Sequence, residues 1–493
     1  MTVHQASAAS MGPAAPSAPT THEPRPPSPA ALDRLAADLL GDVLTSDHPS
    51  YDTERRIWNG EIDRRPAVIT RCQGATDVAT ALRWARDEGR AVAVRGGGHG
   101  IAGHALVDDG LVVDLSPMRG VVVDPVRQTV TVQGGALNAH VDRETQSHGL
   151  AMTTGYISHT GIGGLALGGG IGHLMRAFGL SVDALRSCQV VTAEGRVVRA
   201  SAEEHPDLFW AVRGGGGNFG VATDLTFALR PLGPTVLAGL VAWPAEEAPA
   251  VLAMLRDVIA DAPDELGLMA NLRLAPPLPL FPEHLHGRPI IGLVATWAGP
   301  VEDGEGVLAP IRAFGHPVLD AIAPKPYTLH QRFLDPAVPH GRHYYWRSHR
   351  LGPLTDDVIA VICEHIESIS SPLSTVPIFS FGGAVGRVAA DATAFAHRDA
   401  SHDINVVASW LPEQAGEADR HRAWVRGFAD ALAPHSRGVY VNFTSDDAQS
   451  RVREAYDTAQ WRRLRAVKTT WDPDNVFRGN ANIPPLTAVG SLE

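Results

Sequence analysis

Three glycine-rich clusters in the first half of the chain constrain this sequence more than any other feature. They are residues 95–100 (RGGGHG), 158–172 (SHTGIGGLALGGGIG) and 214–221 (GGGGNFGV). Consecutive glycines let backbone N–H groups converge with no Cβ between them, which forms a concavity suited to a phosphate or pyrophosphate. Together the clusters predict a protein that holds a diphosphate-bearing small molecule against its backbone.

The first cluster follows a buried strand directly. The apolar run 91–94 (AVAV) leads into the glycines and places His99 at the mouth of the loop. Upstream, residues 67–72 read as a strand and 77–88 as a helix with apolar residues on one face, ended by Gly89. The pattern predicts a β-α-β unit that empties into an anion-binding loop.

The second cluster admits two interpretations. Gly161, Gly163 and Ala166 satisfy a GxGxxA pattern, with Asp183 about twenty residues further on, as in a Rossmann dinucleotide-binding unit. A Rossmann turn opens a helix at once, however, and here GGGIG follows after three residues, a composition that disfavours helix. We therefore expect residues 158–172 to form an extended loop along the ligand.

Composition limits the kind of partner. The chain has 493 residues and a net charge of −12, which argues against nucleic acid or an anionic membrane and favours a small molecule. Only three cysteines occur, far apart, which is typical of a reducing, cytoplasmic compartment. No apolar run is long enough to span a bilayer, and the Pro/Ala/Ser-rich residues 1–28 read as a disordered arm with no secretory signal.

The second half of the chain has a different character. Strand-like runs at 236–242, 266–274, 290–296 and 378–381 alternate with helical stretches such as 249–260 and 356–368. This spacing predicts an antiparallel sheet with helices on one face, so the predicted fold class is α+β. We place domain limits at 29–232 and 233–436. A closing segment, 437–493, includes a helix at about 447–468 and returns to the first domain.

The motifs VRGGGHG, SHTGIGGLALGGG, DLFWAVRGGGGNFGV, YVNF and DPDNVFRGNANIPP together resemble the berberine-bridge-enzyme-like oxidases. These share the vanillyl-alcohol-oxidase, or PCMH-type, FAD-binding fold, and the resemblance covers residues 47–486. It implies a two-lobed FAD-binding domain, built from the N-terminal and C-terminal segments, with the antiparallel-sheet domain for substrate between them.

The resemblance makes His99 the residue joined to the 8α-methyl group of FAD, since a neutral imidazole nitrogen is the nucleophile this bond requires. Relatives with a second flavin bond use a cysteine where this chain has Ile157, which implies a single bond. The residues implied to bind FAD are Val94, Arg95, Gly96, Gly97, Gly98, His99, Gly100, His104, Ser158, His159, Thr160, Gly163, Gly164, Gly169, Gly172, Val221, Asn480 and Asn482.

The same resemblance assigns catalytic positions. Thr160 stands where relatives control access of O2 to the flavin, and Tyr440 and Asn442 match a YxN element beside the flavin ring. Many relatives have a second tyrosine where this chain has Phe443. If that tyrosine is the family's base, this protein has lost it.

The activity implied is oxidation of a secondary metabolite such as a polyketide, glycoside or alkaloid, with hydride transfer to flavin and release of H2O2 from O2. The alternative is a flavin–oxygen-adduct enzyme that oxygenates or rearranges a polyketide. The histidine pairs 284/286 and 340/343 lack carboxylates at ligand spacing, so we expect no metal. Arg273, Tyr345 and Trp346 are candidates for the substrate pocket.

Overall fold

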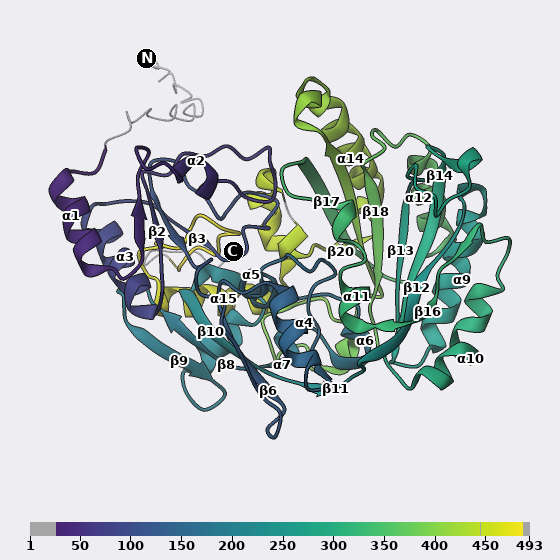
Figure 1. Ribbon diagram of the computed structural model, residues 1–493, viewed down its shortest axis with the longest axis horizontal. Coiled ribbons are helices and arrows are strands. Elements are labelled where there is room, and N and C mark those ends of the chain that lie inside the picture. The colour runs from purple at the N-terminus through teal and green to yellow at the C-terminus, as the bar shows by residue number, and fades with distance from the viewer. Residues whose placement is uncertain (1–25, 444, 487–493) are drawn as a thin grey trace, which may run out of the picture.

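The computed structural model describes residues 26–443 and 445–486, without the side chains of 446–450 (Figure 1). Most of the predicted disordered arm lies outside these residues. The first described helix is α1 (Pro29–Asp38), and the Ser28 hydroxyl oxygen accepts the Ala31 N–H as its N-cap. Within the described part of the chain, no helix is long and apolar enough to cross a membrane.

The first glycine cluster directly follows β3, an edge strand of a small sheet of order β1-β2-β4-β3. Strands β2 and β3 both run parallel to β4, which lies between them, and helix α3 (Ala75–Asp87) connects β2 to β3. The predicted β-α-β unit is therefore present. The strands are β1 (Asp42–Leu44), β2 (Val68–Arg71), β3 (Val92–Arg95) and β4 (Leu111–Asp114).

A second, antiparallel sheet of order β5-β6-β10-β8-β9 completes the first lobe, together with the short pair β7–β11. Strands β5 and β6 form one hairpin of this sheet, and β8 and β9 form another. The strands are β5 (Val121–Asp124), β6 (Thr129–Gln133), β7 (Leu150–Ala151), β8 (Leu185–Val191), β9 (Val197–Ser201), β10 (Val221–Ala228) and β11 (Arg230–Pro231). The helices of this lobe include α2 (Tyr51–Glu54), α4 (Asn138–Gln146), α5 (Ile162–Gly168), α6 (Met175–Phe178), α7 (Ser181–Ala184) and α8 (Pro206–Val212).

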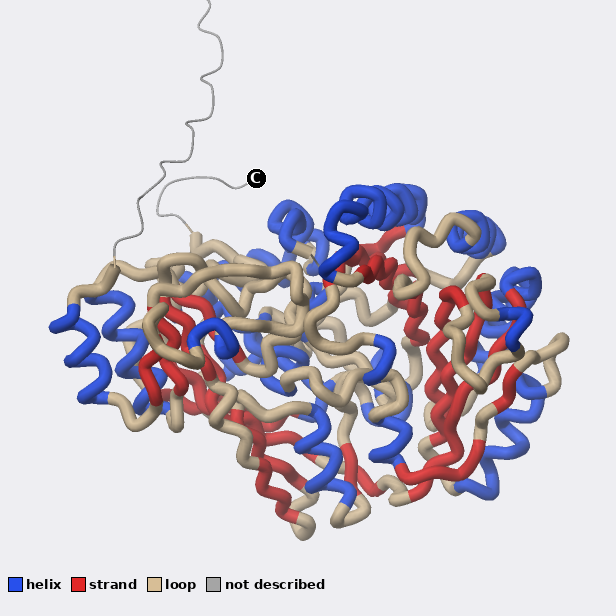
Figure 2. The backbone as a smooth tube through the Cα atoms, turned by 45° about the horizontal axis from the view of Figure 1, so that its top comes forward, coloured by secondary structure: helices blue, strands red, loops and turns tan. Residues whose placement is uncertain are grey.

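The second lobe is built on a nine-stranded sheet whose strand pairs are all antiparallel, which confirms the α+β fold class. In Figure 2 the strands of the two lobes form separate groups with mostly loops between them. The strands are β12 (Thr235–Pro244), β13 (Leu266–Leu274), β14 (Pro289–Trp297), β15 (Leu319–Asp320), β16 (Ala323–Pro326), β17 (His343–Leu351), β18 (Thr375–Ser380), β19 (His402–Trp410) and β20 (Ser436–Gly438).

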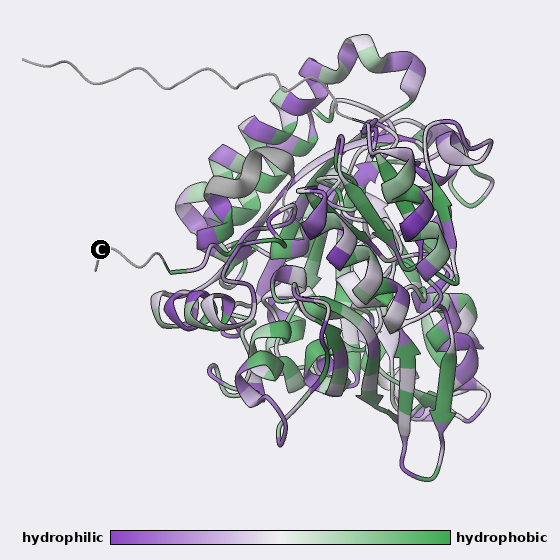
Figure 3. Ribbon diagram, turned by 90° about the vertical axis from the view of Figure 1, so that its left-hand side faces the viewer, coloured by the Kyte–Doolittle hydropathy of each residue, from purple (hydrophilic) through white to green (hydrophobic). Residues whose placement is uncertain are grey.

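The four longer helices of the second lobe cover one face of this sheet, whereas the two short ones, Tyr327–Gln331 and Ala384–Arg387, contact the first lobe. Alternate residues of each strand, such as Leu272 in β13 and Val376 in β18, enter one apolar core with the covering helices. Figure 3 shows mainly hydrophobic strands and helices that alternate in hydropathy. The opposite face of the sheet is turned toward the first lobe. The helices are α9 (Ala248–Asp261), α10 (Val301–Arg312), α11 (Tyr327–Gln331), α12 (Asp356–Ile366), α13 (Ala384–Arg387) and α14 (Ala418–Leu432).

The closing segment packs on the first lobe, where α15 (Thr458–Trp471) contacts α8. The fully buried Lys468 ammonium donates to the Asp472 carboxylate at 2.7 Å and to the backbone oxygens of Asn218 and Phe477 at 2.7 and 3.1 Å. These contacts support the predicted return of the chain, and the domain limits themselves stay a prediction.

Two sequence-based expectations about helices are wrong. The predicted helix at 447–468 is a 3₁₀ segment, Asp446–Ala455, followed by α15, because Asp457 caps α15 with a capping box to Gln460 and so starts a new helix. The predicted extended loop at 158–172 contains helix α5, whose first N–H, that of Ile162, donates to the Ala136 carbonyl at 3.0 Å, so a contact outside the segment holds the start of the helix.

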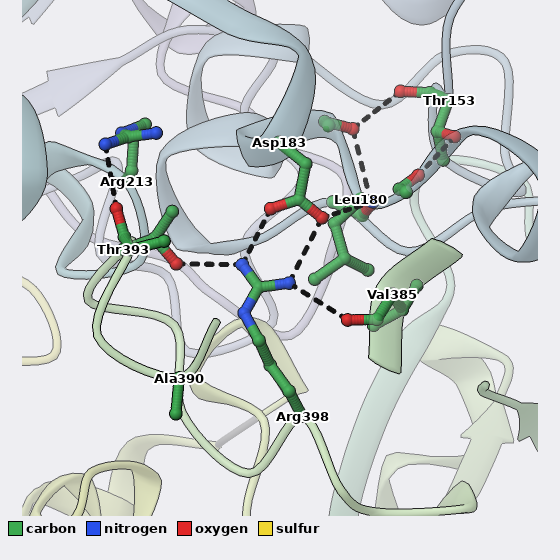
Figure 4. A network of polar contacts seen from close by, with 12 residues as sticks. Thr153, Leu180, Asp183, Arg213, Val385, Ala390, Thr393 and Arg398 are labelled. Carbon is green, nitrogen blue, oxygen red and sulfur yellow. Dashed lines mark hydrogen bonds and ion pairs between the residues drawn. The ribbon is translucent and has the colours of Figure 1, made fainter. Parts of the chain in front are cut away.

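A buried ion pair joins the lobes. Asp183 in α7 of the first lobe accepts from the Arg398 guanidinium of the second lobe at 2.7 and 3.1 Å, and both side chains are almost inaccessible to solvent (Figure 4). Arg398 also donates to the Thr393 hydroxyl at 2.8 Å. Asp183 is thus committed to interlobe packing, which removes the ribose-binding role that the Rossmann interpretation gave it.

We predict that Asp183→Ala lowers the free energy of unfolding by about 3–5 kcal/mol, because it leaves the Arg398 charge buried without its partner. Chemical denaturation of the variant measures the loss. The control is Asp207→Ala, which breaks an exposed pair with Arg463 and should cost less than about 1 kcal/mol. Equal losses in the two variants would contradict an interlobe role for the pair.

Candidate functional site

A cavity of about 410 Å³ lies between the lobes. All three glycine clusters, the uncovered face of the nine-stranded sheet and the closing loop at Gly479–Ala481 contribute to its wall. The segments that line it come from the beginning, middle and end of the chain. The fold therefore builds one site from motifs that are far apart in sequence.

Two glycine loops cross at van der Waals distance on the floor of this cavity. A Cβ on Gly97 would lie 2.5 Å from both the Cα and N of Gly161, and a Cβ on Gly161 would lie 2.4 Å from the Gly97 nitrogen. Gly98 has φ +64°, in the left-handed region that glycine tolerates. Only glycine fits at the crossing, and the crossing fixes His99 opposite the second cluster.

His99 is held from two sides. Its Nε2 lies 3.1 Å from Nδ1 of His159, and its ring stacks on Trp58 with centroids 4.3 Å apart. Desolvation, with smaller effects from His159 and His340, places the pKa of His99 well below its usual value. The imidazole is therefore neutral at pH 7, the form in which a ring nitrogen is a nucleophile.

Sequence reasoning missed two neighbours of His99. The centroid of the His340 ring lies 6.3 Å from that of His99 and 4.9 Å from that of His159, and the Trp58 ring stacks on His99. The His340 loop and residue 58 lie in different lobes, and no motif connects them. No local sequence signal could have identified either residue.

Most predicted site residues do line the cavity. They are Val94, Gly96, Gly97, Gly98, His99, Gly100, His104, Thr160, Gly163, Gly164, Val221, Tyr440, Asn442 and Asn480. Six others do not reach its wall in this structure: Arg95, Ser158, His159, Gly169, Gly172 and Asn482.

Five of these six residues contact other parts of the protein. Arg95 pairs with Glu54 and Asp114, and Ser158 bonds to the Asp335 carboxylate at 2.6 and 2.8 Å. His159 supports His99 from behind, whereas Gly169 and Gly172 lie against the neighbouring Tyr440 ring and the Thr154 carbonyl. Asn482 Oδ1 is buried with no hydrogen-bond partner among the described residues. The predicted contacts of these six residues with a cofactor stay predictions.

Tyr440 is a buried phenol with both nearby donors directed at its oxygen. The Gly170 N–H donates to it at 2.8 Å and Asn442 Nδ2 at 2.9 Å. Burial raises the pKa of Tyr440 to about 12, although the Gly170 hydrogen bond and the Arg350 charge oppose the shift. The phenol is neutral at physiological pH, and its catalytic role stays a prediction.

Aromatic side chains and one charged side chain mark the substrate side of the cavity. The rings of Trp346 and Phe443 form an edge-to-face pair with centroids 5.5 Å apart, and the centroids of Phe443 and Phe379 are 5.6 Å apart. Of the three pocket candidates, Trp346 and Arg273 line the cavity, while Tyr345 points into the core under the helices. Among the described lining residues there is no Asp, Glu or Lys.

The cavity wall fits a ligand that lies close to backbone. A Cβ added at Gly164 or Gly217 would meet no protein atom within 4 Å, and both residues line the cavity. The space beside both α-carbons is therefore free, so a ligand can lie directly against the backbone there. No group of three metal-ligating side chains occurs among the residues that the structure describes.

Comparison with known proteins agrees with this site. Residues 66–201 match the FAD binding domain family model, and residues 439–484 match the model described as berberine and berberine like. The chain is 31% identical over 458 residues to an uncharacterized FAD-linked oxidoreductase, YgaK, of Bacillus subtilis, covering 91% of this chain and 98% of that protein. It is also 31% identical to (R)-6-hydroxynicotine oxidase of Paenarthrobacter nicotinovorans, covering 91% and 97%.

Solved structures show the same architecture. The 6-hydroxy-D-nicotine oxidase of Arthrobacter nicotinovorans matches with a TM-score of 0.82 at 30% identity, covering 91% of this chain and 98% of that one. Xylooligosaccharide oxidase from Myceliophthora thermophila matches with a TM-score of 0.81 at 23% identity, which shows a shared fold. Fold and site together define an FAD-binding oxidoreductase. The chain belongs to the berberine-bridge-enzyme-like family of FAD-linked oxidoreductases.

We predict that Gly97→Ala loses stability, whereas Gly164→Ala loses FAD. Gly97→Ala forces the crossing apart and should lower the free energy of unfolding by about 2–3 kcal/mol. Gly164→Ala should leave the unfolding of FAD-free protein unchanged, because its methyl group meets only open space, but should reduce FAD content. Denaturation curves and the FAD-to-protein absorbance ratio measure the two effects. Normal FAD content in Gly164→Ala would show that the cofactor lies elsewhere.

Proposed function

We propose that this protein is an oxidase with covalently bound FAD. It takes a hydride from a carbon of a small-molecule substrate, and O2 then reoxidises the flavin with release of H2O2. The observation that carries the proposal is the placement of a neutral His99 on the cavity wall, in a glycine loop that faces the open backbone of Gly164. Bound FAD supplies the two-electron acceptor.

The attachment follows from the contacts of His99. The Nε2 contact to His159 leaves Nδ1 as the nitrogen for the bond to the 8α-methyl carbon. A related glucooligosaccharide oxidase from Acremonium strictum, 23% identical, is described with 6-S-cysteinyl, 8α-N1-histidyl FAD. Here Ile157 lines the cavity, whereas Cys72 and Cys188 are free thiols in the apolar cores of the first lobe. We therefore propose a single covalent bond.

The wall formed by the second lobe suits a partly apolar substrate that donates a hydride. The uncovered face of the nine-stranded sheet faces the glycine loops across the cavity, so a substrate can lie between the two. Thr160 lines the same space, where we propose that it governs access of O2. The described wall contains no carboxylate, so we propose that the oxidation uses no carboxylate base.

The substrate class we propose is a secondary metabolite such as a polyketide, glycoside or alkaloid. Similarity to oxidases that are named for 6-hydroxynicotine and xylooligosaccharides supports a small molecule. We also propose a cytoplasmic location, with which the three free cysteine thiols agree.

We predict that denatured wild-type protein keeps its yellow colour and the added mass of one FAD, and that His99→Ala loses both. His159→Ala should retain the attachment site but reduce the covalent fraction several-fold, because His99 then lacks the group that orients its ring. Intact mass and the absorbance of denatured protein give the readings.

The control for these variants is His284→Ala, which removes a histidine in a loop that does not line the cavity. It should keep full covalent FAD. Native protein that is colourless after FAD is supplied would overturn the proposed function altogether.

We predict one H2O2 released for each product formed. A peroxidase-coupled screen of polyketides, glycosides and alkaloids identifies a substrate, and ¹⁸O2 then follows the oxygen atoms. Label in peroxide supports the oxidase. Label in the product, with peroxide well below one equivalent, would instead establish oxygenation or oxidative rearrangement.

A further inference from the structure

One charged side chain in the cavity, that of Arg273, has no oppositely charged partner among the described residues. Arg273 extends from β13 on the face turned to the first lobe, and it is the only Arg, Lys, Asp or Glu among the described residues of the cavity wall. No carboxylate oxygen of the described residues lies within 4.0 Å of its guanidinium group. Its one hydrogen bond runs from Nε to the Leu274 carbonyl at 3.3 Å. The terminal nitrogens thus make no hydrogen bond to the described residues.

The surroundings of Arg273 add to the positive potential. Arg342, on the loop before β17, lies close enough to lower the pKa of Arg273, although desolvation is the larger cause. Arg342 donates to the Ala337 carbonyl at 3.0 Å and likewise has no carboxylate partner among the described residues. A desolvated guanidinium with a like charge nearby is unfavourable unless an anion joins it.

Neutral donors and an aromatic surface continue from Arg273 across the sheet. Thr375, its partner on β18, donates to Oδ1 of Asn271, which leaves the Asn271 amide nitrogen as a donor on the same face. The register then runs from Thr375 to Val407 on β19 and to Trp346 on β17. Arg273 and Trp346 are thus three strand spacings apart, roughly 14 Å between backbones.

We propose that the substrate carries a carboxylate, or another acidic group that is ionised at neutral pH, which pairs with Arg273 while the apolar body lies toward Trp346 and Phe443. The guanidinium fork matches a carboxylate with two parallel hydrogen bonds, and the Asn271 amide adds a third donor. Arg273 is then a specificity-determining residue that orients the substrate along the sheet. This inference deepens the proposed oxidase function and rests on it.

Flavin-containing protein tests the inference with a matched pair of probes, cinnamate and its neutral amide, cinnamamide. Each is titrated against the flavin absorbance spectrum. We expect wild-type protein to bind cinnamate at least about tenfold more tightly than cinnamamide, because only the anion pairs with the charge. Arg273→Gln should abolish this preference, and Arg273→Lys should keep part of it, since a lysine retains the charge without the fork.

The control is Arg288→Gln, which removes an equal charge from an exposed position just before β14, outside the cavity wall. It should leave the preference for cinnamate unchanged. Equal binding of the two probes to wild-type protein, absence of cinnamate binding, or an unchanged preference in Arg273→Gln would each overturn the proposal.

Flavin content separates this inference from the proposed function. Loss of the flavin in Arg273→Gln would show that the arginine serves the cofactor, and would also overturn the substrate assignment. Wild-type protein without any flavin, in contrast, is the failure of the oxidase function itself, and it is visible before any probe is added.

Discussion

The contact between Gly97 and Gly161 is the constraint on which the site depends. A Cβ at either position would lie within about 2.5 Å of the other backbone, so the two loops can cross only without side chains. The crossing brings a loop from a parallel sheet against a helix start from the antiparallel part of the lobe. It sets His99 beside His159 and leaves the backbone of Gly164 open to the cavity. The glycine richness of the sequence is therefore a packing requirement as well as a cofactor requirement.

The second lobe contributes by having one uncovered face. Alternation along β13, β18 and β19 sends Leu272, Val376 and Val406 into the core beneath the helices and sends the intervening residues into the cavity. A single sheet can thus be both a scaffold and a substrate surface. The Asp183–Arg398 pair holds this surface in place over the glycine loops, because it links α7 to the second lobe in a region from which water is excluded.

Few side chains of the described cavity wall are charged or titratable. The wall formed by the glycine loops includes His99 and Thr160, while the wall formed by the second lobe includes Trp346, Phe379 and Arg273. Tyr440 lies where the two sides meet, and its oxygen receives hydrogen bonds from Gly170 and Asn442. Phe443 contributes a ring without a hydroxyl group to the same wall. The single guanidinium gives the cavity a polarity that the apolar side chains alone would lack.

The sequence by itself predicted a diphosphate-bearing ligand and the α+β fold, because glycine clusters and alternating apolar runs act through local backbone geometry. Its motifs, through their resemblance to a family, predicted FAD and pointed to His99 as the proposed anchor. Tertiary structure decided which predicted residues reach the cavity: His159 lies behind His99, Asn482 stays off the wall, and residues 162–168 form a helix where an extended loop was expected. It also brought His340 and Trp58 to the site and turned Arg273 inward while Tyr345 points away. These outcomes depend on contacts between segments that are far apart in the sequence, and no local pattern encodes such contacts.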